Sequence, residues 1–167
     1  PFCALQAAYD GFRVMPMDEA AVLGDVFCTV TGNKHVIRLE HMKRMKNGAI
    51  MANSGHFDIE VDIASLARAS SSTRRVRNFM DEYVLASRKL FILGEGRLVN
   101  LAAAEGHPCE VMSTSFCGQA LSCEYGVKNR GKMPVQVIQL PEAVDNDIAA
   151  LQLKVMGIGI DTMTAEQ

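Results

Sequence analysis

Apolar and amphipathic stretches alternate along the first half of the chain. The segment DVFCTVT, residues 25–31, is almost continuously apolar or β-branched, which predicts a strand covered on both faces. AIMAN, residues 49–53, predicts the next buried strand. Between them, Leu39, Met42 and Met45 recur at three-residue spacing, which predicts a helix whose last turn carries basic residues. This order is typical of βα units that build a parallel sheet.

The same patterns predict shorter elements around these strands. A polar loop is expected where the serine-rich run ARASSSTRR occurs, and two strands joined by a short turn follow it. The ranges are helices at 2–8, 17–23 and 60–68, a strand at 12–15, the polar loop at 67–75, and strands at 76–85 and 89–93.

The pattern changes near Gly94, after which helices are expected to dominate. Pro108 suits the first turn of a helix, because that turn needs no intrahelical amide donor there. A strand is predicted at 135–141. A helix is predicted at 142–156, with an apolar face formed by Val144, Ile148, Leu151 and Val155.

Composition narrows the class of protein. The 167 residues are 49% hydrophobic and 22% charged, enough for one good core or two small lobes. A formal net charge of -2 gives no electrostatic basis for binding a polyanion, so nucleic acid is not an expected partner. No apolar run approaches the roughly 20 residues that span a bilayer. The expected location is the cytoplasm, away from membranes.

Cysteine and histidine spacing argues against disulfides and metal sites. Five cysteines make an odd number and include no CxxC pair. The four histidines show neither HxxxH nor clustered Cys/His spacing. We therefore predict reduced cysteines and no bound metal.

Two loops that follow predicted strands are the candidates for chemistry, VTGNK and NSGHFD. In a parallel sheet both emerge at one edge, which brings Thr31, Gly32, Ser54, Gly55 and His56 into a common neighbourhood where a nucleotide can bind. The histidine is either an ordinary surface residue or a ligand contact, since a neighbouring glycine lets the backbone approach a ligand. No GxGxxG or P-loop motif is present, because GEGRLV has two glycines of three and TGNK lacks the upstream glycine.

His107 presents a similar choice. It lies just before a predicted helix, so a capping role competes with a role in a binding site.

Five segments together resemble one known family. They are PFCALQAAYDGFRV, DVFCTVTGNKHVI, LEHMKRMKNGAIMANSGHFDIEVD, GEGRLVNLAAAEGHPCEVMSTSF and LKVMGIGIDTMTAEQ, and the likeness runs from Pro1 to Gln167. The chain resembles the S-adenosylhomocysteine hydrolases, and GHFD, EGRLVNL and GHP are the most specific of the shared motifs.

The resemblance implies an activity. These enzymes use tightly bound NAD to oxidise the ribose 3′-hydroxyl of S-adenosyl-L-homocysteine, which acidifies the 4′ hydrogen, so that L-homocysteine is eliminated. Water then adds and the hydride returns, which gives adenosine. The expected cofactor is NAD, and the expected small-molecule partners are S-adenosylhomocysteine and adenosine.

The resemblance also implies site residues. Ser54, Gly55 and His56 would meet the nicotinamide end of NAD, Asn100 its carboxamide, and Cys3 the adenosine half, while His56 would be catalytic. Leu98 and Met112 are either adenine contacts or ordinary core. The implied cofactor-binding residues are Cys3, Thr31, Gly32, Asn33, Ser54, Gly55, His56, Asn100 and His107, and the implied substrate-binding residues are Leu98, His107 and Met112.

The implied fold is α/β, a partial Rossmann-like parallel sheet forming the second half of an NAD-binding domain. Residues 1–94 would belong to that domain, and residues 95–167 would return toward the substrate domain and contribute oligomer contacts. Family members are more than twice this long and form homotetramers. We therefore expect the chain alone to bind NAD weakly, to be inactive, and to need the remainder of the enzyme or homologous subunits as partners.

Some positions depart from the family pattern. Gly118 stands where asparagine is usual, Gly94 where alanine is usual, and Ala86-Ser87 where the turn tends to carry glycine. An alternative function is therefore a non-catalytic NAD-binding or subunit-interaction module derived from the family. A third candidate, a 2-hydroxyacid-type dehydrogenase, gives GHP and EGRLVNL no role.

Overall fold

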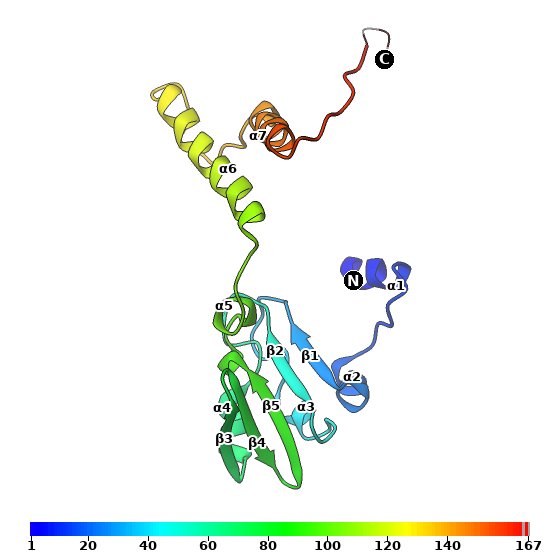
Figure 1. The fold of residues 1–167 in the computed structure, drawn as a ribbon. Coiled ribbons are helices and arrows are strands. Elements are labelled where there is room, and N and C mark those ends of the chain that lie inside the picture. Colours follow the sequence, from blue (N-terminus) through cyan, green and yellow to red (C-terminus); the bar gives the residue numbers. More distant parts are fainter. Residues whose placement is uncertain (165, 167) are drawn as a thin grey trace. The chain divides into compact units, whose positions relative to one another are not determined.

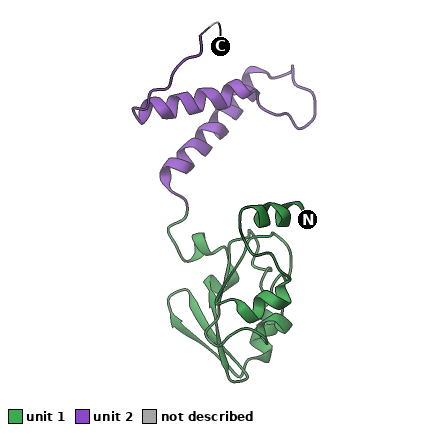
Figure 2. Cartoon of the chain, turned by 90° about the vertical axis from the view of Figure 1, so that its right-hand side faces the viewer, with its two compact units in different colours: residues 1–106 green, residues 107–167 purple. Residues whose placement is uncertain are grey.

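The structure, a computed structural model, describes residues 1–164 and 166. The chain forms two compact units, residues 1–106 and residues 107–167 (Figure 2). The sequence predicted a domain boundary after Gly94. The assignment of residues 1–94 and 95–167 to two domains of a larger enzyme stays a prediction.

A mixed five-stranded sheet is the centre of the first unit (Figure 1). Its strand order is β1-β2-β5-β4-β3, in which β1, β2 and β5 are parallel and β5, β4 and β3 form an antiparallel meander. The strands are β1 (Val26–Thr29), β2 (Ile50–Asn53), β3 (Ser72–Arg77), β4 (Met80–Leu85) and β5 (Arg88–Leu93). The predicted α/β class with a partial Rossmann-like sheet is confirmed.

Short helices supply the rest of the hydrophobic core of the first unit. Their apolar residues, such as Ala21, Met42 and Leu66, pack with strand residues such as Met51 and Ile92, and these side chains are almost fully buried. The helical elements of this unit are α1 (Phe2–Tyr9), α2 (Met17–Leu23), α3 (Leu39–Met42), α4 (Ile63–Ala69), the 3-10 turn η1 (Gly94–Gly96) and α5 (Val99–Ala102). The helices predicted at 2–8, 17–23 and 60–68 are therefore present, with small shifts of their ends.

The prediction that the first strand is covered on both faces is wrong for this chain. Phe27 and Thr29 face the core, whereas Val26 is 66% exposed and Cys28 is also exposed. The strand ends at Thr29, so Val30 lies beyond it and is exposed. Helix packing covers only one face of β1, and the continuous apolar run therefore leaves a row of side chains open to solvent.

Two other local predictions fail for reasons of pairing. Residues 12–15 form no strand, since no described strand lies beside them to accept their backbone hydrogen bonds, and Phe12 is exposed. The predicted polar loop at 67–75 contains most of β3 instead. Arg74 and Arg75 stabilise that strand by ion pairs with Glu82 and Asp81 of β4, with nitrogen-oxygen distances of 2.6 and 2.9 Å.

The second unit is helical. Helix α6 (Cys109–Lys128) follows Pro108, and α7 (Glu142–Val155) packs against α6 and carries the buried residue Ile148. The helix prediction at 142–156 is confirmed, although Leu151 and Val155 of its apolar face are exposed. The strand predicted at 135–141 is wrong, because no described strand pairs with this segment and Val135 is fully exposed.

Candidate functional site

The two candidate loops emerge at the same edge of the sheet. Strands β1 and β2 are adjacent and parallel, with Thr29 in register with Asn53. The backbone N–H of Ser54 donates to the carbonyl oxygen of Thr29 at 2.7 Å, which holds the start of the second loop against the end of β1. The carboxyl ends of parallel strands thus present residues 31–33 and 54–57 side by side, the place where α/β folds bind ligands.

Asn53, the last residue of β2, holds the second loop, NSGHFD, in place through hydrogen bonds of its side chain. Its side chain is fully buried, and Oδ1 accepts hydrogen bonds from the Thr29 hydroxyl at 3.2 Å and from the Gly55 N–H at 2.7 Å. Nδ2 donates to the carbonyl oxygens of Phe57 at 2.7 Å and Gly96 at 2.9 Å. One amide therefore joins three segments of the site and satisfies all of its own donors and lone pairs.

Glu60 connects the second loop to the first. Oε2 accepts from the N–H and the hydroxyl of Thr31, at 3.0 and 2.9 Å, and Oε1 accepts from the N–H of Gly32 at 2.6 Å. Burial by itself raises the pKa of this carboxyl, but the hydrogen bonds from Thr31 and Gly32 outweigh burial and bring the pKa below its ordinary value. Glu60 is therefore a carboxylate at neutral pH.

Gly55 is required by the close approach of that carboxylate. A Cβ atom at position 55 would lie 1.7 Å from Oε1 of Glu60 and 3.0 Å from Oδ1 of Asn53. The sequence predicted that this glycine lets the backbone approach a ligand closely. In the structure, the space beside Gly55 is taken by a side chain of the protein itself.

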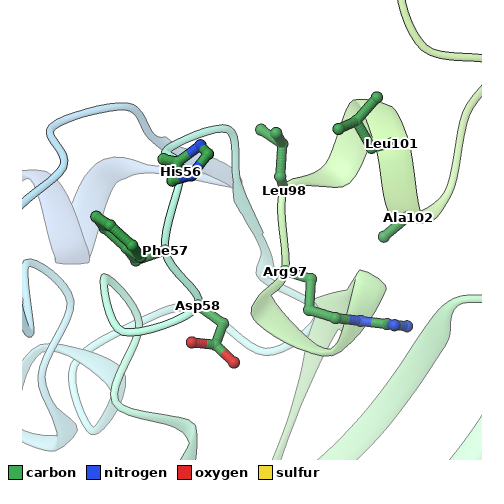
Figure 3. Close-up of a pocket in the computed structure, with 7 residues that line it drawn as sticks. All are labelled: His56, Phe57, Asp58, Arg97, Leu98, Leu101 and Ala102. Atoms are coloured by element: carbon green, nitrogen blue, oxygen red, sulfur yellow. The ribbon is translucent and has the colours of Figure 1, made fainter.

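A cavity of about 480 Å³ opens beside the second loop (Figure 3). His56 and Phe57 form one side, where their rings meet edge to face with centroids 4.9 Å apart. Leu98 and Leu101 approach from the segment that includes α5. The full lining is His56, Phe57, Asp58, Arg97, Leu98, Leu101 and Ala102. This volume is in the range of small-molecule sites.

Asn100, on α5 between the cavity residues Leu98 and Leu101, carries an unsatisfied polar atom. Its Oδ1 is buried and has no hydrogen-bond partner among the described residues. Buried side-chain acceptors are normally paired, so the orphaned atom is suited to a ligand that brings a donor. The carboxamide –NH₂ of a nicotinamide ring is such a donor, and the residues present here therefore fit NAD.

The other predicted residues lie in different places. Thr31 and Asn33 line a second cavity of about 440 Å³, together with Lys34, His35 and Arg38. Cys3 is exposed on α1, a helix with no buried residue. His107 is exposed and Met112 is half-buried on α6, and both belong to the second unit.

Roles for Asn53 and Glu60 were not predicted from the sequence. The sequence contains one indication for each residue. Asn53 is a polar amide at the end of an apolar strand, and Glu60 is a carboxylate between the apolar residues Ile59 and Val61. A polar group inside an apolar run is either functional or internally paired, and here both are paired.

Among residues 1–164 and 166, no three His, Cys, Asp or Glu side chains gather closely enough to hold a metal ion. In the same part of the chain, no helix combines the length and apolar character needed to cross a membrane.

Comparison with known proteins identifies the family. Residues 1–106 match the family described as "S-adenosyl-L-homocysteine hydrolase, NAD binding domain". The whole chain is 60% identical to an adenosylhomocysteinase of Thermosynechococcus vestitus and covers 39% of that protein. It is 54% identical to an S-inosyl-L-homocysteine hydrolase of Methanocaldococcus jannaschii and 52% identical to an adenosylhomocysteinase of Saccharolobus solfataricus. Both alignments cover all of this chain and 40% of the relative.

The chain thus spans about 40% of the length of the curated relatives that it matches. The family match covers the unit that contains the sheet, both loops, the cavity and Asn100. The chain belongs to the S-adenosyl-L-homocysteine hydrolase family.

Proposed function

We propose that this chain contributes part of the NAD site of an enzyme that hydrolyses S-adenosyl-L-homocysteine to adenosine and L-homocysteine. Membership of this family supports the proposed reaction. The main structural support for NAD binding is the buried Oδ1 of Asn100, which has no hydrogen-bond partner among the described residues. Bound NAD would supply the transient oxidation of the ribose 3′-hydroxyl. The residues of this chain bind and orient the reactants and transfer protons.

Asn100 would accept a hydrogen bond from the nicotinamide carboxamide and so fix which face of the ring is presented. The loop of Ser54, Gly55 and His56 would lie along the nicotinamide end, held in shape by Asn53 and Glu60. Thr31, Gly32 and Asn33 would border the same crevice, and Cys3 would contact the adenosine half of the dinucleotide.

His56 is the proposed catalytic residue of this chain. Its imidazole is exposed and lines the cavity, where it can contact both cofactor and nucleoside and transfer a proton. Leu98 would pack against the adenine ring. His107 would contact both cofactor and nucleoside and Met112 the adenine in the assembled enzyme.

The names of the relatives specify different purine bases in the substrate. Proteins with 60% and 54% identity to this chain carry names that specify adenosyl and inosyl substrates. We propose S-adenosyl-L-homocysteine as the substrate because several relatives bear that name, at identities from 50% to 60%.

The partners would be further polypeptide of the same enzyme, as the remainder of the molecule or as homologous subunits in a homotetramer. Strand β1 supports this, since it lies at the end of the sheet and exposes Val26 and Cys28 on its uncovered face. An open strand edge beside apolar surface is normally covered. All five cysteines are free, which supports a reducing compartment such as the cytoplasm.

The test is release of homocysteine by the protein expressed from its full gene, supplied with NAD and with either S-adenosyl- or S-inosyl-L-homocysteine. We expect turnover of the adenosyl substrate, and a loss of about 100-fold or more in kcat for His56→Asn. Asn129→Ala is the matched control, because Asn129 lies in the second unit and its Nδ2 donates to the carbonyl oxygen of Tyr125. NAD binding without turnover of either substrate would instead favour the non-catalytic module.

A further inference from the structure

Glu60 has a role in the site beyond holding two loops together. Its side chain is fully buried, although it is charged, and no Lys, Arg or His among the described residues forms an ion pair with it. An unpaired buried carboxylate is costly unless hydrogen-bond donors surround it. Thr31 and Gly32 provide three such donors, two of them backbone N–H groups.

Those two N–H groups form the kind of concave donor pair that binds anions in proteins. In nucleotide-binding folds, backbone amides at this edge of a sheet commonly hold phosphate oxygens. Here the distances of 3.0 Å from Thr31 and 2.6 Å from Gly32 show that both donors already bind a carboxylate. A phosphate group would have to displace Glu60 and would meet its negative charge.

The negative charge of Glu60 also acts on the second loop. Oε1 lies so close to Gly55 that no Cβ atom fits between them. The carboxylate is therefore packed directly against the backbone of the loop that carries His56. Charges in such a buried setting are screened far less than charges at the surface.

We propose that Glu60 is an internal anion that closes the Thr31–Gly32 amides to phosphate groups and favours the cationic, oxidised nicotinamide ring over the neutral, reduced ring. The second half of this inference rests on the proposed function, which places the nicotinamide end of NAD along Ser54–His56. Glu60 acts through the loops, so it is a positioning and specificity-determining residue. It exchanges neither a proton nor an electron with the cofactor.

The first experiment tests the internal anion in the protein expressed from its full gene, before any cofactor is added. Amide ¹H–¹⁵N shifts of Thr31 and Gly32 are followed while formate or pyrophosphate is added to the wild type, to Glu60→Ala and to Glu40→Gln. Glu40 is an exposed carboxylate paired with Arg38, so its variant is the matched control. We expect saturable shifts of both amides only in Glu60→Ala, where the small anion replaces the lost carboxylate.

Saturable binding of pyrophosphate to these amides in the wild type would overturn the inference, and so would amides in Glu60→Ala that respond to neither anion. If Glu60→Ala does not fold, Glu60→Gln in the same titration serves instead. Its side chain retains the shape of glutamate and lacks the charge. The predicted result is then an upfield displacement of the Gly32 amide proton, because the hydrogen bond at 2.6 Å loses its charged acceptor.

The second experiment measures dissociation constants for NAD and NADH in the protein expressed from its full gene. We expect Glu60→Gln to weaken NAD binding by about tenfold while NADH binding changes by less than about twofold, and Glu40→Gln to alter neither. Equal weakening of both cofactors would contradict the charge role of Glu60 and leave the proposed function intact. A wild type that binds neither cofactor would overturn the proposed function and the redox preference together, while the amide titration would still decide the phosphate part.

Discussion

The side-chain amide of Asn53 donates a hydrogen bond to the carbonyl oxygen of Gly96, with 2.9 Å between Nδ2 and the oxygen. This bond joins the end of β2 to the turn that precedes α5, and α5 carries Asn100. The position of the proposed carboxamide acceptor therefore depends on a buried residue that does not itself line the cavity.

Replacing Asn53 with alanine should destabilise the first unit by about 3 kcal/mol, because the N–H of Gly55 and the carbonyl oxygens of Phe57 and Gly96 lose their buried partner. Urea unfolding measures the change. Asn129→Ala removes a single bond at the end of α6 and should cost about 1 kcal/mol or less. Similar losses for the two variants would contradict the proposed joining role of Asn53.

Two glycines should respond to alanine in opposite directions. Gly118 lies inside α6, and a Cβ atom there would be 4.0 Å from Cδ1 of Ile148, so Gly118→Ala should stabilise the second unit by about 1 kcal/mol. Gly96 has φ of +76°, and a Cβ atom there would lie 2.4 Å from Cδ1 of Ile63. Gly96→Ala should therefore destabilise the first unit by about 2 kcal/mol or more. Chemical denaturation followed by circular dichroism compares both variants with the wild type.

The turn between β4 and β5 contains a strained residue. Ala86 has φ of +56°, a left-handed conformation that costs a residue with a Cβ atom about 1 kcal/mol relative to glycine. Ala86→Gly should raise the free energy of unfolding by about that amount. Ser87 is not among the residues with positive φ, so Ser87→Gly should leave stability unchanged or lower it. An increase for Ser87→Gly as large as for Ala86→Gly would show that backbone strain is not the cause.

Acidification should weaken the junction of the two loops. The pKa of Glu60 is lower in the folded chain than its ordinary value of 4.5, and that of Asp62, whose carboxylate accepts from the N–H of Ser65, is lower than 3.8. Both groups thus contribute stability that is complete above these ordinary values and is lost as the pH falls through the folded pKa. Thermal unfolding between pH 7 and pH 3 should show a steep loss below pH 4.5 in the wild type. Glu60→Gln should be less stable at pH 7 and should show a shallower slope in that window.

The sequence predicted the parallel strands, the main helices and the loops that form the site edge. The apolar runs at 25–31 and 49–53 are long enough to predict strands, although one face of the first strand is exposed, and a strand end followed by glycine predicts a loop. The pairing of Arg74 with Glu82 could not be predicted from the sequence, because a run of serine and arginine is typical of a loop and only the position of β4 beside it shows the strand. The strands expected at 12–15 and 135–141 failed for the complementary reason, since strand propensity produces a strand only where another strand supplies its hydrogen bonds.

Within the candidate site, the side chains that we propose as ligand contacts were easier to predict from the sequence than the side chains that hold the loops. His56 and Asn100 occur in motifs that resemble the family. Asn53 and Glu60 became evident only from the contacts that they make across 24 to 43 residues of sequence. Their importance is geometric, and one-dimensional patterns carry little information on which distant groups a buried carboxylate or amide meets.

The most direct test of the account is the affinity of the protein expressed from its full gene for NAD compared with nicotinic acid adenine dinucleotide, measured by calorimetry. The analogue carries a carboxylate in place of the carboxamide, so it has no N–H to donate to Oδ1 of Asn100. We predict that the wild type binds NAD at least about tenfold more tightly than the analogue and that Asn100→Ala abolishes the difference. Equal affinity for the two dinucleotides, or discrimination that survives in Asn100→Ala, would contradict the placement of the nicotinamide carboxamide at Asn100.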